Sequence, residues 1–236
     1  MMIQVKDDLL PEQLSFEDYR FWEPPDDCHY ELFRGRLIRM DPPAPLHVTI
    51  SQFLVYQWQQ YLVSQNLSLV VRTETGVRTE TSSSRIPDVT ICTQALWEKL
   101  SNRPGGGILD FAQEEMPRLV VEVVSSNWRE DYLRKRAEYA IIQVPEYWIV
   151  DYVRQQVWVL TNPDRPEGYE VVKRYPGEVV ESLEFPGFSL DVDEVLNPPF
   201  VEDLIRQAQS EQATLRNRAD SMAAKLRELG VDPDAL

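Results

Sequence analysis

The chain has 236 residues, of which 24 are basic, 39 acidic and 43% hydrophobic, so its formal net charge is −15. This length and apolar content can close one sizeable core, which excludes disorder as the default. Apolar stretches such as residues 119–121 and 123–124 fall far short of the ~18 residues of a membrane span. The N-terminus lacks the basic region and apolar core of a secretory signal. We therefore expect a soluble cytoplasmic protein with no membrane partner.

The acidic balance argues against a nucleic-acid partner, because phosphate binding draws on lysine and arginine. Such binding would require a local basic surface or bound cations. Only two cysteines occur, Cys28 and Cys92, and they form no C-x-x-C pattern. This argues against a disulfide framework or a thiolate zinc site, and we expect both to be reduced.

The first half of the chain predicts short strands around one helix. Residues 30–40 indicate two strands that turn at Gly35, and the apolar residues between positions 50 and 61 recur at helical steps up to about Asn66. Segments 67–72, 76–80 and 86–92 are typical of a strand meander. Residues 93–117, with the glycine triplet 105–107, are expected to be irregular. The triplet lacks the G-x-x-x-x-G-K-[ST] pattern, so a flexible loop is favoured over phosphate binding.

The second half predicts a buried strand, a helix and two strand pairs. Residues 118–124 are apolar on both faces, as expected of a central strand. A helix is expected over 129–142, ending before Val144-Pro145. Segments 146–151 and 157–161 should pair, as should 171–175 and 179–182. This order of elements indicates a mixed α/β sheet with helices packed on it.

Two acids interrupt apolar strands. Glu122 lies among valines and a leucine, where an unpaired carboxylate would cost several kcal/mol, so a cation should face it. Asp88 begins a similar strand. Two acids on neighbouring strands could share a divalent ion, and Mg²⁺ prefers a few carboxylates plus water. The alternative is that Asp88 caps a turn and Glu122 pairs with an arginine.

A third feature favours the metal site over that alternative. Asp131, Lys135 and Tyr139 lie at four-residue steps and so share one helix face. A lysine near a metal-bound water could orient the water and stabilise charge on a phosphate. The competing interpretation is a surface lysine paired with Asp131.

These residues resemble the PD-(D/E)XK nuclease superfamily, specifically its Uma-two type of restriction-endonuclease-like proteins. The resemblance covers roughly residues 15–195. It is carried by these segments: Tyr30-Glu31-Leu32 with Gly35, His47 before the first helix, Ile86-Pro87-Asp88-Val89, Val120-Val121-Glu122-Val123, and Val144-Pro145-Glu146-Tyr147-Trp148-Ile149-Val150-Asp151.

The resemblance implies a central four-stranded mixed sheet flanked by helices, Mg²⁺ or Mn²⁺ as cofactor, and hydrolysis of DNA phosphodiesters. Asp88 and Glu122 would be metal ligands, with the carbonyl of Val123 as a further ligand, and Glu31 would complete the site. The superfamily lysine should lie two residues after Glu122, where this chain has Val124. Lys135 on the helix matches it instead. For His47, a structural role and a functional role both stay open.

Metal-assisted phosphodiester hydrolysis is thus the favoured function, with Lys135 positioning the attacking water. DNA-backbone contacts are expected from the basic helix residues Arg129, Arg134 and Arg136, and further ones from Arg34, Arg36 and Arg39. A solvated helix face is the alternative for the first three. A non-catalytic nuclease-fold binding or interaction module is the alternative for the whole protein. Serine or cysteine hydrolases are disfavoured, because the chain has only two histidines and no G-x-S-x-G elbow.

Residues 197–236 are expected to form a helical tail beyond a nuclease-like domain of residues 1–196. Its helix should begin after Pro198-Pro199 and end near Gly230. Apolar and small residues recur there at steps of three and four, which predicts a coiled-coil-like seam that forms a homodimer. Folding of the helix back onto its own core is the alternative. The seam comprises Val201, Leu204, Ala208, Glu211, Leu215, Ala219, Met222, Leu226 and Leu229.

Overall fold

The structure is a computed structural model that describes residues 10–125 and 127–228. It divides into two compact units, Met1–Pro198 and Pro199–Leu236, so the division falls two residues after the expected 196/197 boundary. Among the described residues, no helix is both long and apolar enough to cross a membrane. The cytoplasmic location stays a prediction.

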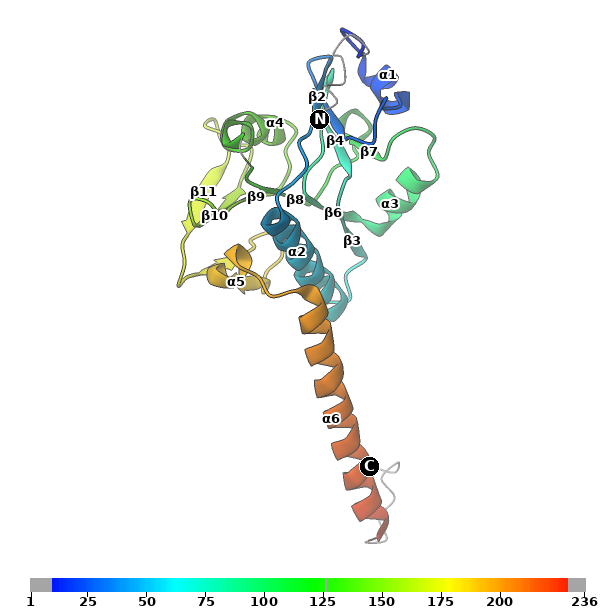
Figure 1. Cartoon of the computed structure of the whole chain (residues 1–236), viewed down its shortest axis with the longest axis vertical. Coiled ribbons are helices and arrows are strands. Elements are labelled where there is room, and N and C mark those ends of the chain that lie inside the picture. Colours follow the sequence, from blue (N-terminus) through cyan, green and yellow to red (C-terminus); the bar gives the residue numbers. More distant parts are fainter. Residues whose placement is uncertain (1–9, 126, 229–236) are drawn as a thin grey trace, which may run out of the picture. The chain divides into compact units, whose positions relative to one another are not determined.

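A six-stranded mixed sheet forms the centre of the first unit (Figure 1). Only β8 and β9 run parallel, and every other neighbouring pair is antiparallel. The expected mixed sheet is confirmed, with six strands rather than four, and β8 lies in its interior as predicted. The strand order is β11 (Glu170–Arg174), β10 (Gln156–Thr161), β9 (Glu146–Asp151), β8 (Leu119–Val123), β6 (Val89–Thr93) and β3 (Leu69–Arg72).

A second, five-stranded sheet carries the other part of the site. The predicted hairpin at Gly35 is confirmed, and both Arg34 and Gly35 have positive φ (50° and 83°), as a two-residue hairpin turn requires. Pairing of β1 with β5 sets Leu32 opposite Ser84, which brings Glu31 beside Arg85. The strand order is β2 (Arg36–Arg39), β1 (Tyr30–Phe33), β5 (Ser83–Arg85), β4 (Gly76–Glu80) and β7 (Ile108–Asp110).

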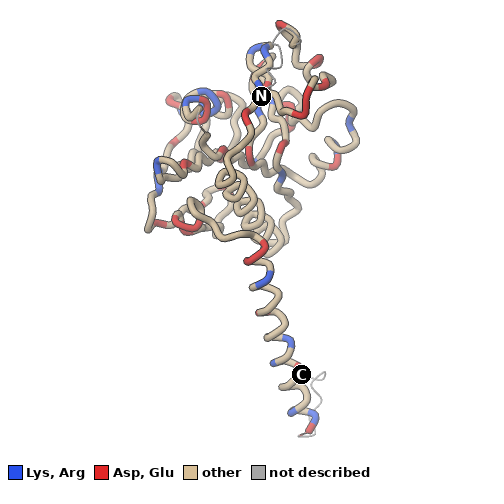
Figure 2. The backbone as a smooth tube through the Cα atoms, in the orientation of Figure 1, with Lys and Arg blue, Asp and Glu red and all other residues tan. Residues whose placement is uncertain are grey.

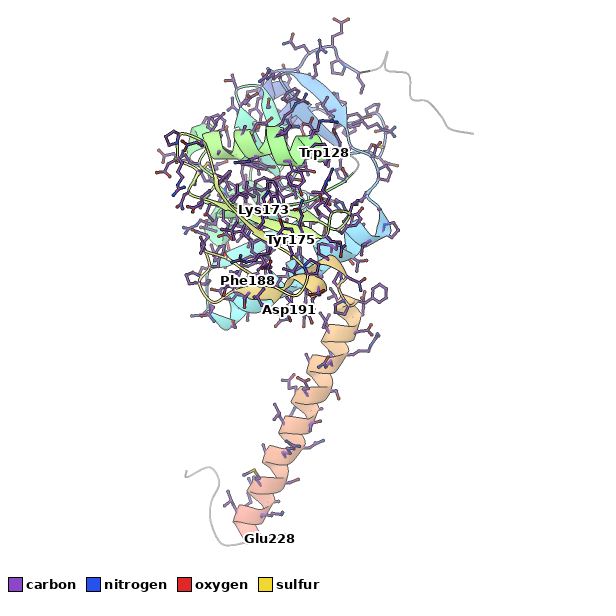
Figure 3. All side chains as sticks on the ribbon, turned by 90° about the vertical axis from the view of Figure 1, so that its left-hand side faces the viewer. Trp128, Lys173, Tyr175, Phe188, Asp191 and Glu228 are labelled. Carbon is purple, nitrogen blue, oxygen red and sulfur yellow. The ribbon has the colours of Figure 1, made fainter. Side chains whose placement is uncertain are left out.

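Helices cover both faces of the large sheet. Because side chains alternate along a strand, Trp148 of β9 faces α2 (Pro45–Ser64), whereas its neighbour Tyr147 packs with Tyr139 on the other face. The second face is covered by the π-helical η3 (Glu130–Lys135) and α4 (Arg136–Ile141), a continuous helical segment. On the first face Trp58 of α2 stacks on Phe188 at 3.4 Å between ring centroids (Phe188 is labelled in Figure 3), and α5 (Val192–Leu196) packs beside α2.

Three expectations about strands and loops are wrong. Segments 67–92 form no meander, because β3 pairs with β6 while β4 and β5 belong to the second sheet. Residues 93–117 are not all irregular: they contain α3 (Gln94–Ser101), capped by the Thr93 hydroxyl, and β7. Segments 171–175 and 179–182 do not pair, since β11 joins β10 and β12 (Val179–Glu181) joins β13 (Ser189–Asp191). Two-residue periodicity identifies a strand but not its partner.

The stacking of Trp58 on Phe188 predicts that this contact contributes strongly to the stability of the first unit. Trp58 is fully buried, so Trp58→Ala should lower the free energy of unfolding by about 3–5 kcal/mol. Val63→Ala in the same helix is the matched control, because Val63 is 79% exposed and should change stability by less than ~0.5 kcal/mol. Urea unfolding followed by circular dichroism measures both. Similar losses for the two variants would contradict the prediction.

Candidate active site

Glu122 projects from β8 toward the helix above the sheet. It is 3% exposed, and its Oε2 lies 2.8 Å from Lys135 Nζ. The hydroxyl of Tyr139 donates a hydrogen bond of 2.8 Å to the other carboxylate oxygen. The prediction that a cation faces Glu122 is therefore confirmed, and the cation is a lysine rather than the arginine of the alternative interpretation.

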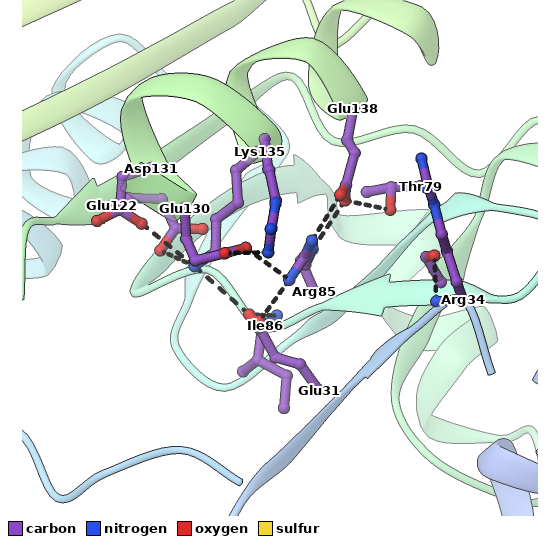
Figure 4. Close-up of polar contacts among 12 residues, drawn as sticks. Glu31, Arg34, Thr79, Arg85, Ile86, Glu122, Glu130, Asp131, Lys135 and Glu138 are labelled. Atoms are coloured by element: carbon purple, nitrogen blue, oxygen red, sulfur yellow. Dashed lines mark hydrogen bonds and ion pairs between the residues drawn. The ribbon is translucent and has the colours of Figure 1, made fainter. Parts of the chain in front are cut away.

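Lys135 is the centre of an acidic cluster (Figure 4). Its side chain is 8% exposed, and Nζ lies 3.4 Å from Glu31 Oε1 and 3.5 Å from Asp131 Oδ1, in addition to Glu122. The shared helix face of Asp131, Lys135 and Tyr139 is confirmed, and the surface-lysine interpretation is wrong. A π-helical turn, which often marks functional sites, presents Asp131 and Lys135 toward the sheet.

Burial and mutual repulsion shift the ionisation of this cluster. Burial raises the pKa of Glu122 well above its usual value, the charge of Lys135 opposes the shift, and Asp131, Asp88 and Glu31 add to it. Burial likewise raises the pKa of Asp131 to about 6, against the charge of Lys135. For Lys135, burial lowers the pKa, but the three carboxylates outweigh it and the pKa lies well above normal. The carboxylates of the cluster, when ionised, thus carry more negative charge than the single ammonium of Lys135 neutralises.

Asp88 directly precedes β6 and contacts two other elements. Its Oδ1 is 2.8 Å from Nε2 of His47, in the first turn of α2, and its Oδ2 accepts a hydrogen bond of 2.7 Å from the backbone N–H of Val123. Asp88 therefore fixes α2 against the end of β8, one residue from Glu122. His47, whose role the sequence left open, is in direct contact with a candidate ligand.

Sequence reasoning missed Arg85, which is 1% exposed and links the cluster to the second sheet. Its Nη1 donates to Glu31 at 2.9 Å and its Nη2 to Glu138 at 2.5 Å. The backbone N–H of Ile86 donates to the other oxygen of Glu31. Burial by itself raises the pKa of Glu31, but Lys135 and Arg85 together hold it below normal. The available signal was a basic residue directly before the Ile86-Pro87-Asp88 segment.

The donor chemistry of the cluster fits a hard divalent cation. Asp88, Glu122 and the Val123 carbonyl offer oxygen atoms only, and nearby negative charges already disfavour ionised Glu122. Within residues 10–125 and 127–228, no group of three or more histidine, cysteine or acidic side chains is arranged to hold an ion. Mg²⁺ commonly takes one or two carboxylates and keeps several waters, so a two-carboxylate site is chemically sufficient.

The basic residues expected to contact DNA are distributed unevenly. The guanidinium groups of Arg34 and Arg134 each lie 5.2 Å from the ring centroid of Phe33, so the structure brings together two residues far apart in sequence. Arg129 is exposed, and its guanidinium lies 4.7 Å from the ring of Trp128. Arg136 is directed elsewhere, since it donates to the carbonyl of Tyr169 at 3.5 Å.

The fold and this cluster together define a restriction-endonuclease-like protein. The Uma2 family, described as "Putative restriction endonuclease", matches residues 16–193, and the chain belongs to this family. The chain also resembles the crystal structure of "a putative nuclease belonging to DUF820 from Anabaena variabilis ATCC 29413". The TM-score is 0.55, with 16% identity over 74% of this chain and 93% of the other. At that identity the likeness shows the fold alone. No curated protein matches the chain.

The burial of Lys135 predicts a large contribution to stability. Lys135→Met, which keeps the volume but removes the charge, should lower the free energy of unfolding by about 3–5 kcal/mol at pH 8, because it leaves buried carboxylates unpaired.

Lys99→Met is the control for this variant, since Lys99 is 56% exposed although it also pairs with a buried glutamate. It should lose less than about 1 kcal/mol. Guanidinium unfolding of both variants makes the comparison. Equal stability of Lys135→Met and the wild type would show that the ammonium is not needed to balance the cluster.

Proposed function

We propose that this protein is a Mg²⁺- or Mn²⁺-dependent endonuclease that hydrolyses DNA phosphodiester bonds. One observation carries the proposal. A buried lysine contacts Glu122, Glu31 and Asp131, while Asp88 is hydrogen-bonded to the backbone one residue beyond Glu122. Paired acids and a lysine next to a strand end can bind an oxygen-preferring cation and stabilise charge on a phosphate. Family membership supports a nuclease in general terms.

Asp88 and Glu122, with the Val123 carbonyl, would hold the ion. When bound, the ion lowers the pKa of a coordinated water and neutralises charge on the scissile phosphate. Lys135 remains protonated at neutral pH because its pKa is raised, so it acts as a hydrogen-bond donor that orients the attacking water and not as a general base. The surrounding residues position these groups: Tyr139 holds Glu122, and His47 holds Asp88.

Glu31 acts in this proposal mainly by fixing Lys135. Both of its oxygens accept hydrogen bonds from the second sheet, one from Arg85 and one from Ile86, and one of them also faces Lys135 Nζ. The ammonium is therefore held between two sheets rather than by its own helix alone. Because the Lys135 ammonium is already held in place, it needs little rearrangement when negative charge develops on the phosphate during the reaction.

The proposed DNA contacts are Arg129, Arg134 and Arg34, whereas Arg136 donates to the Tyr169 carbonyl and is not among them. Arg34 and Arg134 are the best placed, because Phe33 follows Glu31 by two residues on the same strand and so lies on the same face of the sheet. Positive charge beside the acidic cluster would position a phosphate backbone without reading its sequence.

A non-catalytic binding module is the second candidate, favoured by the net charge of −15. An interaction module has no need for a lysine buried among acids next to Asp88, whereas an enzyme has. Isothermal titration of the whole protein with Mn²⁺ distinguishes the two, since saturable binding that is lost in Asp88→Ala supports the enzyme.

We extend the proposal to the second unit, whose helix α6 (Val201–Glu228) would join two copies of the chain. The predicted start after Pro198-Pro199 is confirmed, whereas the predicted end near Gly230 and the seam residue Leu229 lie outside the described residues. None of the described residues of α6 is buried by other residues of its own unit. A helix that buries no face is only marginally stable in water, so it gains from a partner.

Cleavage should depend on Asp88. We expect single- or double-stranded DNA to be cut with Mg²⁺ or Mn²⁺, and EDTA to abolish cutting. Asp88→Ala should reduce the rate more than ~100-fold, since even groups that only support a metal ligand account for ~10- to 100-fold. Asp164→Ala, an exposed aspartate in the same unit, is the control and should retain full activity. Cleavage by Asp88→Ala at the wild-type rate would remove Asp88 from the mechanism.

DNA affinity should depend on Arg34 and Arg134. Arg34→Gln and Arg134→Gln, each in the Asp88→Ala background to prevent cutting, should weaken binding and reduce the slope of log K against log salt by about 1 each. Arg118→Gln is the control. Like Arg34, which pairs with Glu80, and Arg134, which pairs with Glu130, Arg118 is exposed and ion-paired, but it directly precedes β8, at the end of that strand away from Glu122. Fluorescence anisotropy across a salt series measures the slopes. A loss as large in the control would indicate a nonspecific charge effect.

A further inference from the structure

The seam of α6 is symmetric about Leu215. From Leu215 the seam residues follow at steps of four, three and four toward both ends of the helix. A uniform heptad would alternate three and four throughout, so the two four-residue steps that meet at Leu215 are a departure from it. Because the spacing is the same in both directions, a second copy running the opposite way can match every position. The seam residues within the described helix are Val201, Leu204, Ala208, Glu211, Leu215, Ala219, Met222 and Leu226, and the counterpart of Val201, Leu229, lies outside the described residues.

The sizes of the seam residues favour the opposite direction. In an antiparallel pair centred on Leu215, Ala208 meets Met222 of the second copy, and Glu211 meets Ala219. These two layers then each combine a small residue with a larger one, which fills space evenly, while leucine meets leucine at Leu215 and between Leu204 and Leu226. In a parallel pair every residue meets itself. Two small alanines would then face each other in two layers, and two Glu211 carboxylates would meet inside the seam, where like charges are destabilising.

The charges of the two halves of α6 are complementary. Residues 200–214 contain three acids and one base, whereas residues 216–228 contain four bases and two acids. Figure 2 shows the acids at the start of α6 and most of the basic residues toward its end. An antiparallel pair sets each acidic half beside a basic half, and a parallel pair would set like halves together. Flanking charges of this kind determine partner orientation in coiled coils.

We propose that α6 forms an antiparallel two-helix dimer with a second copy of this chain, with its two-fold axis at Leu215. This orientation rests on the self-association proposed above. Val201, where the helix begins, lies 14 residues before Leu215, so the two attachment points are about 42 Å apart along the dimer axis at 1.5 Å per residue. Each first unit is therefore attached at its own end of the helix pair.

Disulfide trapping tests the orientation in the full chain. Ala208→Cys and Met222→Cys chains, co-expressed with different tags and oxidised, should give a mixed-tag disulfide dimer in yields at least ~5-fold above either same-tag dimer. Each variant expressed alone should crosslink poorly, because residue 208 of one copy lies far from residue 208 of the other. The wild type, which retains Cys28 and Cys92, is the control for background crosslinks.

Light scattering separates failure of the orientation from failure of the dimer. The full chain should be a dimer, and a chain ending at Asn197 should be a monomer. A dimer in which Ala208→Cys crosslinks efficiently to itself would overturn the antiparallel arrangement while retaining self-association. Equal oligomeric states of the two chains would overturn both. Circular dichroism of each cysteine variant checks that α6 still forms.

Discussion

The buried ammonium of Lys135 is the interaction on which the first unit depends. It contacts Glu31 from the second sheet, Glu122 from the large sheet and Asp131 from its own helix. A lysine taken out of water without partners would be strongly disfavoured, and so would the acids without the lysine. Neither the helix nor the two strands can therefore hold these side chains in place alone. The cluster couples the packing of the helix to the relative placement of the two sheets.

This constraint gives a physical reason for the departure from the superfamily pattern at position 124. Val124 lies on the same face of the sheet as Glu122, but it is 1% exposed and belongs to the apolar cluster with Val144, Tyr147 and Ile149. An ammonium there would be surrounded by aliphatic and aromatic groups. From the helix, Lys135 reaches the carboxylates from above the sheet.

Part of the candidate site could be predicted from the sequence, because a charged residue within an apolar strand stands out locally. Glu122 required a cation, and four-residue spacing placed Lys135 on one face with Asp131 and Tyr139. What sequence could not supply was pairing between distant strands. Arg85 became visible only when β5 was seen to pair with β1, and β4 and β5 join the second sheet through contacts that no local periodicity encodes. The DNA roles and the metal-ligand assignments stay predictions.

The acidic composition conflicts less with a DNA substrate than the net charge suggests. Within the described part of the chain, eight acids are buried against two buried bases, so the interior accounts for six of the fifteen excess negative charges. These acids are engaged by internal donors, as Asp151 is by the hydroxyl of Tyr132 and Glu115 by Arg103. Solvent-exposed charges are screened within ~8–10 Å, so a polyanion such as DNA interacts chiefly with charges close to the surface that it contacts. Under the proposed function, the charge that would decide binding is local: Arg34 and Arg134 near Phe33, and a divalent cation held by Asp88 and Glu122.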